Sequence, residues 1–193
     1  MRTVILTQNT PLACYLAART LLAPGHSVAA IFSGRKPGLP GRGTLRLLQQ
    51  NVPLTLLGLR ILELSTAICR KHMSPFVSGC GTLLTLENLS RCFSVPVHHT
   101  AGVSTERSLA LLRELRPDLL LSIYFPERFP SSMLCLPRLA AVNVHPSLLP
   151  RHRGLLPCLY ALLDEDTSAG ITIHIMNERF DEGDILAQRS FVI

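Results

Sequence analysis

The stretch that decides the fold is residues 3–33, TVILTQNTPLACYLAARTLLAPGHSVAAIFS. Its first five residues form a continuous apolar run, which is typical of a strand buried on both faces of a parallel sheet. Thr10 and Pro11 then supply an N-cap and a first helical position for a helix over residues 12–22. Residues 26–33 form a second apolar strand. A strand–helix–strand unit of this length predicts a right-handed βαβ crossover.

The rest of the chain continues the alternation of strands and helices. Its apolar periodicity predicts helices over residues 85–92, 104–115 and 157–163, and strands over residues 95–98, 119–123, 140–145, 171–176 and 186–193. Residues 34–53 are typical of an exposed loop leading into a short helix, and residues 54–66 are too rich in Leu for periodicity to separate helix from strand. The pattern predicts one α/β domain over residues 1–193, with a Rossmann-like open, mostly parallel sheet and helices on both faces.

The composition excludes several classes of protein. Apolar residues make up 47% of the 193 residues, which rules out a disordered chain. Trp is absent and aromatic residues make up only 5%, which argues against a stacking surface for single-stranded nucleic acid. The net charge of +6 comes from scattered Arg residues without a run, so it favours anionic small molecules over a nucleic-acid partner.

The cysteines and the apolar runs bear on the cellular setting. The six Cys residues have no C-x-x-C spacing, which argues against a zinc site or a disulfide framework and favours a reducing, cytoplasmic location. No uninterrupted apolar stretch reaches membrane-spanning length, so we expect no membrane partner. The cysteine spacing leads us to expect no bound metal.

Asn143-Val144-His145-Pro146 places two polar side chains at the end of the predicted strand 140–145. Residues two apart in a strand point to the same face, so Asn143 and His145 project together. Pro146 lacks a backbone donor and ends the ladder. The pair therefore lies where open α/β sheets bind their ligands. Two interpretations remain open at this point: a reactive pair, or an Asn and a His that end the strand for structural reasons.

Two charged loops follow this motif. Residues 147–154 (SLLPRHRG) contain Arg151 and Arg153, which either bind a carboxylate or phosphate or are solvated surface cations. Residues 177–184 (NERFDEGD) contain Asp181, which either orients the histidine of the preceding motif or is a soluble turn residue.

Other reactive motifs are missing from the sequence. It contains no G-x-S-x-G elbow, no H-E-x-x-H helix, no Walker loop, and no G-x-G-x-x-G after the first strand. His174 lies on the polar face of the predicted strand 171–176; it either approaches the ligand pocket or has a packing role, and the packing role is favoured.

The segment NVHPSLLPRHRG (residues 143–154), followed by GITIHIM (170–176) and FDEGDIL (180–186), resembles the catalytic domain of formyltransferases. This family includes the glycinamide ribonucleotide, methionyl-tRNA and amino-sugar formyltransferases. It also includes the hydrolase domain of 10-formyltetrahydrofolate dehydrogenase, whose histidine loop is especially similar. The similarity extends over residues 116–188 and is faint before residue 95.

The resemblance implies a role for each residue of the motif. Asn143 would stabilise the oxyanion of the formyl group, and His145 would act in proton transfer and as an electrophilic partner. Asp181 would orient His145, and transfer would be direct, without a nucleophilic Cys or Ser. The donor would be 10-formyltetrahydrofolate, with its pterin between the loops 124–129 and 179–184. The residues that the resemblance places around the pterin are Tyr124, Phe125, Phe129, Arg179, Phe180, Gly183 and Asp184.

Departures from the family pattern bear on the acceptor. Gln8-Asn9-Thr10-Pro11 replaces the Gly-rich phosphate loop of the glycinamide ribonucleotide enzymes, and no accessory domain like that of the tRNA enzymes is recognisable after the last strand. We therefore expect formyl transfer to a small-molecule amine, of which an amino sugar is one example. Two alternatives stay open: hydrolysis of 10-formyltetrahydrofolate to formate, and a folate-binding domain without turnover. The sequence is silent on oligomeric state.

Overall fold

The computed structural model describes residues 1–34, 85–125 and 127–193. Within these ranges, seven strands form one sheet in the order β3-β2-β1-β4-β5-β6-β7. The strands are β1 (Arg2–Thr7), β2 (Ser27–Ser33), β3 (Val97–His99), β4 (Leu119–Ile123), β5 (Ala140–His145), β6 (Ser168–Ile175) and β7 (Ile185–Val192). The five neighbouring strands β3, β2, β1, β4 and β5 run parallel to one another. Strands β6 and β7 then add to the sheet in antiparallel pairs.

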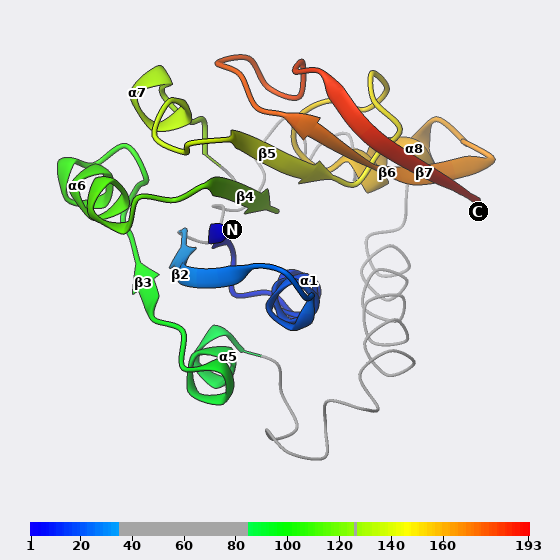
Figure 1. Ribbon diagram of the computed structural model, residues 1–193. Helices are drawn as coiled ribbons and strands as arrows, with labels where there is room; N and C mark the ends of the chain where they lie inside the picture. The colour runs from blue at the N-terminus through cyan, green and yellow to red at the C-terminus, as the bar shows by residue number, and fades with distance from the viewer. Residues whose placement is uncertain (35–84, 126) are drawn as a thin grey trace.

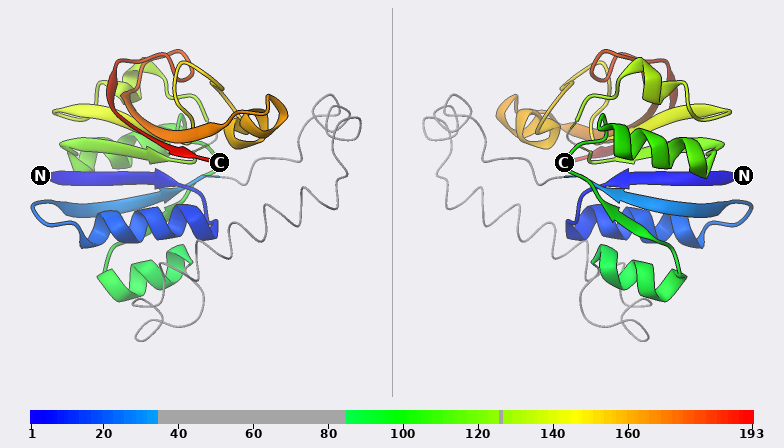
Figure 2. Two further views of the ribbon diagram at one scale, coloured as in Figure 1. Left: turned by 90° about the vertical axis from the view of Figure 1, so that its right-hand side faces the viewer. Right: turned by 90° about the vertical axis from the view of Figure 1, so that its left-hand side faces the viewer.

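Helices cover both faces of the sheet. They are α1 (Pro11–Leu22), α5 (Leu86–Phe93), α6 (Glu106–Leu115), α7 (Ser131–Leu134) and α8 (Pro157–Leu163). Figures 1 and 2 show α1 and α5 side by side on one face and α6 on the opposite face. The predicted fold class, an open and mostly parallel α/β sheet with helices on both faces, is therefore confirmed.

The core alternates across the sheet, as the alternation of side chains along a strand requires. In β1, Val4 and Leu6 pack in the core under α6 and α7, whereas Ile5 packs in the core under α1 and α5. All three side chains are fully buried. The continuous apolar run at the start of the chain thus supplies both cores at once.

The chain reverses direction across the sheet between β1 and β4. It runs outward from β1 to β2 and β3, and then returns through α6 to place β4 on the other side of β1. In open α/β sheets, ligands bind outside the carboxyl ends of the strands near such a reversal. The carboxyl end of β5, next to β4, therefore faces the expected ligand side.

Most predicted elements are observed with small shifts of their ends. The strands at 119–123 and 140–145 and the helix at 157–163 are confirmed residue for residue. Helix α7 was missed, because a single four-residue turn inside a Pro-containing loop has too little periodicity to be detected. The predicted loop after residue 34 and the ambiguous residues 54–66 lie outside the described residues.

The expectation that the cysteines stay reduced is wrong for Cys92, which is disulfide-bonded. Cys135 and Cys158 are free thiols. Across the described ranges, no helix has the length and hydropathy to cross a membrane, and no cluster of three or more His, Cys, Asp or Glu side chains could hold a metal ion.

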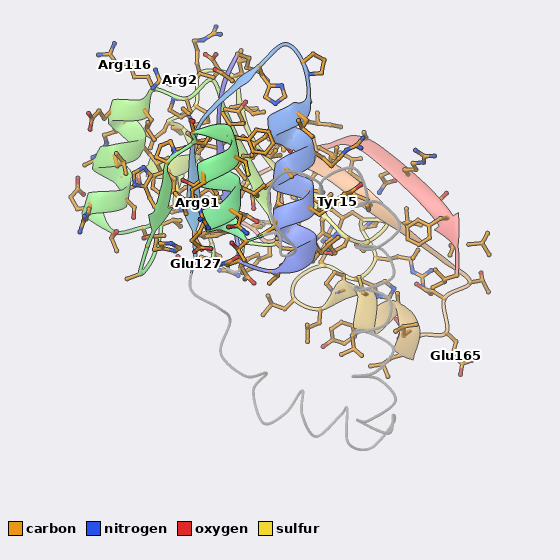
Figure 3. The ribbon with its side chains drawn as sticks, turned by 90° about the horizontal axis from the view of Figure 1, so that it is seen from below. Arg2, Tyr15, Arg91, Arg116, Glu127 and Glu165 are labelled. Atoms are coloured by element: carbon orange, nitrogen blue, oxygen red, sulfur yellow. The ribbon has the colours of Figure 1, made fainter. Side chains whose placement is uncertain are left out.

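Basic side chains are spread over separate elements. Figure 3 shows Arg2 and Arg116 at one end of the molecule, and Arg91 on helix α5. Arg2 starts β1 and donates its backbone N–H to Asp118 at 2.7 Å. Arg138 pairs with the same carboxylate at 2.8 Å. These pairs agree with the scattered distribution of Arg residues along the sequence.

Burial in the centre of the sheet predicts a large stability effect for Leu120 in β4, which is only 1% exposed. Replacing Leu120 with Ala removes buried methyl groups and leaves a cavity, so we expect the free energy of unfolding to fall by about 2–5 kcal/mol. Urea denaturation measures this change. The control Leu139→Ala, at a side chain 58% exposed, is expected to shift it by less than about 0.5 kcal/mol. Equal losses in both variants would contradict the assigned core.

Candidate active site

Two neighbouring antiparallel strands bring the site together. Asn143 and His145 are the fourth and sixth residues of β5, and β6 pairs with β5 so that His174 lies opposite Asn143. Asp181 lies in the turn between β6 and β7. The side chains of His145, His174 and Asp181 are all buried, with 5%, 3% and 8% of their surface exposed.

Asp181 is the point at which these side chains meet. Its Oδ1 atom lies 3.5 Å from His145 Nδ1 and 3.4 Å from His174 Nε2. The same Oδ1 accepts a hydrogen bond from Asn143 Nδ2 at 3.3 Å. Its Oδ2 accepts the backbone N–H of Gly154 at 2.8 Å. One carboxylate therefore contacts two imidazoles, one amide and the loop that follows β5.

The surroundings keep this carboxylate ionised. Burial alone raises the pKa of Asp181, because a charged group loses its hydration. The hydrogen bonds from His174 and from the Gly154 N–H, together with the charges of His145 and His174, outweigh burial and lower the pKa below its ordinary value of 3.8. Asp181 is thus available as an acceptor that orients imidazole rings at neutral pH.

Each histidine of the site lies between two acceptors. His145 has Asp181 on its Nδ1 side, and its Nε2 lies 3.0 Å from the backbone oxygen of His152. His174 has Asp181 on its Nε2 side, and its Nδ1 lies 2.8 Å from the backbone oxygen of Ile175. A neutral imidazole has one N–H donor, whereas an imidazolium has two and satisfies both acceptors. These contacts fix the orientation of each ring.

Gly183 holds the Asp181 turn against β6. A Cβ atom at this position would lie 1.7 Å from the backbone oxygen of Ile175 and 3.5 Å from His174 Nδ1. Only a residue without a side chain allows so close an approach of two backbones. Asp181 itself has a positive φ of 53°, which completes the turn. Gly183 thereby contributes to the site through the backbone, two residues after the carboxylate.

The loop after β5 is anchored to β6 and β7. Thr172 Oγ1 donates to the backbone oxygen of Ser147 at 2.6 Å and accepts the N–H of Leu149 at 3.1 Å. Gln188 Nε2 donates to the Leu149 oxygen at 2.7 Å. These buried contacts fix the start of the loop relative to His145.

Both arginines of this loop are paired with carboxylates of the same chain. Arg151 pairs with Asp166, and Arg153 Nη1 lies 3.2 Å from Glu182 Oε1. Each guanidinium is thus about half exposed and paired with a carboxylate, so neither is a free surface cation or an unpaired ligand-binding group. Exposed ion pairs of this kind contribute little to the position of the loop.

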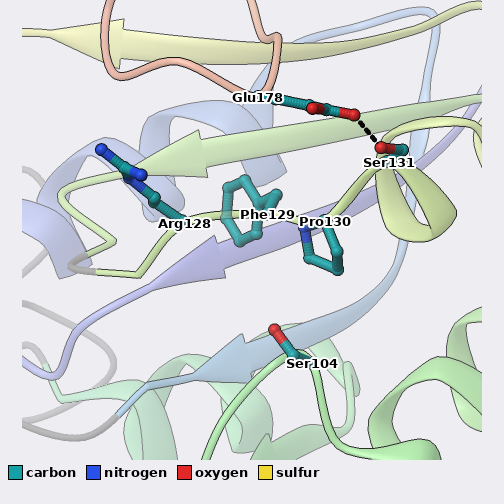
Figure 4. A pocket seen from close by; sticks show the side chains of 6 residues that line it. All are labelled: Ser104, Arg128, Phe129, Pro130, Ser131 and Glu178. Atoms are coloured by element: carbon teal, nitrogen blue, oxygen red, sulfur yellow. Dashed lines mark hydrogen bonds between the residues drawn. The ribbon is translucent and has the colours of Figure 1, made fainter.

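A pocket of about 390 Å³ lies beside the loop that follows β4. Figure 4 shows the side chains that line it, which are Ser104, Arg128, Phe129, Pro130, Ser131 and Glu178. Ser131 donates to Glu178 across the pocket. The Arg128 guanidinium lies over the Phe180 ring, 4.6 Å from its centroid. This cation–π contact joins the loop after β4 to the loop after β6.

The seven residues expected around a pterin are only partly brought together. Phe129 lines the pocket, its ring centroid lies 5.5 Å from that of Phe125, and Phe180 is joined to the pocket by Arg128. Tyr124 packs instead in the core under α1 and α5, on the other face of the sheet, and burial raises the pKa of its phenol. The structure thus separates Tyr124, which follows the end of β4 with a positive φ of 54°, from the phenylalanines.

The remaining predicted contacts lie on the β6–β7 turn. The Arg179 side chain is exposed and pairs with Glu182 at 3.4 Å. Gly183 packs on β6, and the backbone oxygen of Asp184 accepts the N–H of Ile175 at 2.9 Å. In the described structure these residues shape the turn through their backbones.

His174 was predicted to be a packing residue, and this prediction is wrong. Its Nε2 lies 3.3 Å from Asn143 Nδ2 as well as 3.4 Å from Asp181 Oδ1. A usable signal was present in the sequence, because antiparallel pairing of the 140–145 and 171–176 strands brings polar residues of the two strands face to face. The Gly154 N–H was also missed, since a backbone donor leaves no trace in residue type.

A half-buried amide, two buried imidazoles and a buried carboxylate thus meet at the carboxyl end of an α/β strand, and these groups can donate hydrogen bonds and hold a proton. The family model described as "Formyl transferase" matches residues 82–193, which is more than half of the chain. The chain belongs to the formyl transferase family, whose members use 10-formyltetrahydrofolate as the formyl donor.

Similar sequences bear the name methionyl-tRNA formyltransferase. The protein of that name from Ehrlichia ruminantium (strain Gardel) is 37% identical over 130 residues, which cover 62% of this chain and 40% of the relative. The one from Listeria monocytogenes serotype 4a (strain HCC23) is 41% identical over 100 residues, covering 52% and 32%. The match thus spans less than half the length of these relatives.

Solved structures share the fold. Phosphoribosylglycinamide formyltransferase from Bacillus halodurans superposes with a TM-score of 0.64 at 18% identity, covering 100% of this chain and 80% of that one. A sugar N-formyltransferase from Shewanella sp. FDAARGOS_354 gives 0.55 at 19% identity, covering 100% and 58%. At these identities the likeness establishes the α/β architecture.

The lowered pKa of Asp181 predicts how stability depends on pH. Because the folded pKa lies below the unfolded one, the stabilisation is present above pH 3.8 and is lost as the pH falls through the folded pKa. Between about pH 5 and about pH 2, the free energy of unfolding is therefore expected to fall more in the wild type than in Asp181→Asn. Denaturant unfolding at a series of pH values measures the difference.

The matched control for this experiment is Asp184→Asn, at an exposed carboxylate of the same turn. It is expected to leave the pH dependence of the wild type unchanged. If the free energy of unfolding falls equally with pH in the wild type and in Asp181→Asn, the hydrogen bonds to Asp181 do not stabilise its ionised form.

Proposed function

We propose that this protein transfers a formyl group from 10-formyltetrahydrofolate to a primary amine. The observation that carries the proposal is the contact of Asn143, His145 and His174 with one buried carboxylate at the carboxyl end of β5. Membership of the formyl transferase family supports the type of reaction. The site supplies an amide donor and a proton-holding imidazole, which are the groups that attack of an amine on a formyl carbon requires.

The amide of Asn143 stabilises the charge that develops during this attack. As the amine nitrogen bonds to the formyl carbon, the carbonyl oxygen becomes an oxyanion, and an N–H donor aimed at it lowers the barrier. Asn143 Nδ2 contacts Asp181 Oδ1 and His174 Nε2 at 3.3 Å each. The N–H that donates to Asp181 Oδ1 holds the amide before any ligand arrives, and the second N–H of Nδ2 is the donor for the oxyanion.

His145 moves the proton. The attacking amine must lose a proton, and the departing nitrogen of the donor must gain one, so a single group that does both completes the exchange. His145 lies between the Asp181 carboxylate and the His152 oxygen, which together hold the ring in one orientation. Asp181 remains ionised throughout and holds the ring in place.

Among the free thiols of the described ranges, Cys158 lies beside the strand that carries His145, and its chemistry favours direct transfer without an acyl-enzyme. Cys158 Sγ lies 3.7 Å from the backbone oxygen of Pro146, next to His145 in the chain. Burial raises the pKa of this thiol, which keeps it protonated and a poor nucleophile at neutral pH. The amine therefore attacks the formyl carbon itself.

The residues beside the pocket suit a flat, polar heterocycle. Phe129 offers an aromatic wall, and Ser104 and Glu178 offer hydrogen-bonding groups at its edge. The Arg128–Phe180 contact links the loop after β4 to the β6–β7 turn beside the pocket. We assign the pterin of the donor to this region, with Phe125, Phe129 and Phe180 as its apolar neighbours and the 179–184 turn beside its edge.

The acceptor is a primary amine, and two sources are candidates. The relatives that are 37% and 41% identical carry the name methionyl-tRNA formyltransferase, which favours the amine of an aminoacyl-tRNA. The sequence itself favours a small amine such as an amino sugar, because it lacks clustered basic and aromatic residues. An acceptor panel must therefore contain both methionyl-tRNA and amino sugars.

Removal of the reactive side chains tests the proposal. Asn143→Ala is expected to lower kcat/KM for formyl transfer by about 10²–10³-fold, the usual loss of one oxyanion donor. His145→Ala is expected to lower it by about 10²–10⁴-fold, the usual contribution of a general acid–base. Tetrahydrofolate binding, measured by calorimetry, is expected to change less than about threefold, because neither residue lines the donor pocket.

The control is His26→Ala. His26 Nε2 also contacts a backbone oxygen, that of Thr20 at 2.8 Å, but the residue lies before β2 and outside the site. It is expected to retain wild-type transfer. Full activity in His145→Ala would refute the assigned mechanism, and loss of activity in His26→Ala would show that the effect is not specific to the site.

A further inference from the structure

The loop after β5 contains a second buried histidine–carboxylate pair, separate from Asp181. His152 Nε2 lies 2.7 Å from Asp166 Oδ2, and both side chains are less than 10% exposed. His152 Nδ1 lies 3.7 Å from Asp164 Oδ2, and Arg151 also pairs with Asp166. The imidazole of His152 is therefore held between two carboxylates at the junction of α8 and β6.

The backbone of His152 contacts His145, whereas its side chain contacts Asp166. Its carbonyl oxygen is the partner of His145 Nε2, at 3.0 Å. His152 has a positive φ of 53°, a conformation that a side-chain-bearing residue adopts only when its surroundings hold it there. The pair with Asp166 provides that hold, because it anchors the side chain of the same residue.

These contacts close a ring around the reactive histidine. Asp181 contacts His145 Nδ1 and accepts the N–H of Gly154, while the carbonyl of His152, two residues before Gly154, faces His145 Nε2. Nε2 therefore faces this loop directly, and Nδ1 faces Asp181, which the same loop contacts through the Gly154 N–H. The position of that loop depends in turn on the His152–Asp166 pair.

We propose that His152 is a positioning residue, which uses its side-chain bond to Asp166 to hold its own carbonyl against His145 Nε2. It acts through His145 and not on the substrate. Its role follows from the chain of contacts from Asp166 through His152 to His145. The kinetic part of its test rests on the proposed formyl transfer, whereas the spectroscopic part does not.

The spectroscopic test is the ¹⁵N NMR signal of His145 Nε2 in the ligand-free protein, assigned by its loss in His145→Asn. In His152→Ala we expect this signal to move toward the value of a ring without a carbonyl partner. In His152→Gln the side-chain amide can still donate to Asp166, so the wild-type signal is expected to return. The His26→Ala variant serves as the control and is expected to leave the His145 signal in place.

The kinetic test separates positioning from binding. His152→Ala is expected to lower kcat for formyl transfer by about 10–100-fold, with KM for the donor little changed, because the reactive ring is misplaced while the donor pocket is intact. His152→Gln is expected to recover most of the loss. Arg151→Ala removes the neighbouring ion pair but keeps the His152–Asp166 bond, and is expected to stay within about threefold of wild type.

The outcomes are decisive in each arm. An unmoved His145 signal in a folded His152→Ala protein would overturn the proposal, as would an equal loss of kcat in the Gln and Ala variants. If His152→Ala does not fold, the Gln variant and Asp166→Asn carry the NMR comparison. A protein without formyl transfer but with the expected NMR shift would retain the positioning role and refute the proposed function alone.

Discussion

The buried carboxylate of Asp181 is the interaction on which the rest of the site depends. An unpaired buried charge costs several kcal/mol, so the fold must surround it with donors. It does so with His145, His174 and Asn143 on Oδ1 and the Gly154 N–H on Oδ2. These partners come from three segments of the chain, namely β5, β6 and the loop that follows β5. The requirement to satisfy one charge therefore fixes the geometry of the reactive groups.

The sheet makes that arrangement possible by changing direction at its edge. Parallel strands up to β5 bring Asn143 and His145 to the ligand side, and the antiparallel β6 then returns past them with His174 in register. The β6–β7 turn ends close enough to present Asp181, because Gly183 allows it to lie against the Ile175 carbonyl. A wholly parallel sheet would carry the chain away through a helix at this point.

Sequence reasoning recovered what depends on local pattern. The βαβ start, the strand carrying Asn143 and His145, and the family all followed from apolar runs and short motifs. It failed where tertiary contacts decide. His174 looked like a packing residue because its partners come from other segments. Tyr124 was grouped with Phe129, but it follows β4 with a positive φ of 54° and packs in the core under α1 and α5. The Gly154 N–H and the carbonyl of His152 belong to the backbone, which residue identities do not reveal.

The measurement that tests the central claim most directly is the fate of a labelled formyl group. Purified protein is incubated with 10-[¹³C]formyltetrahydrofolate, with and without a panel containing methionyl-tRNA and amino sugars, and ¹³C NMR follows the label. We expect the label to move into an N-formyl group only when an amine acceptor is present. Label released as formate whether or not an amine is added would show hydrolysis, and label that stays on the folate despite binding would show a domain without turnover. Either result would contradict formyl transfer.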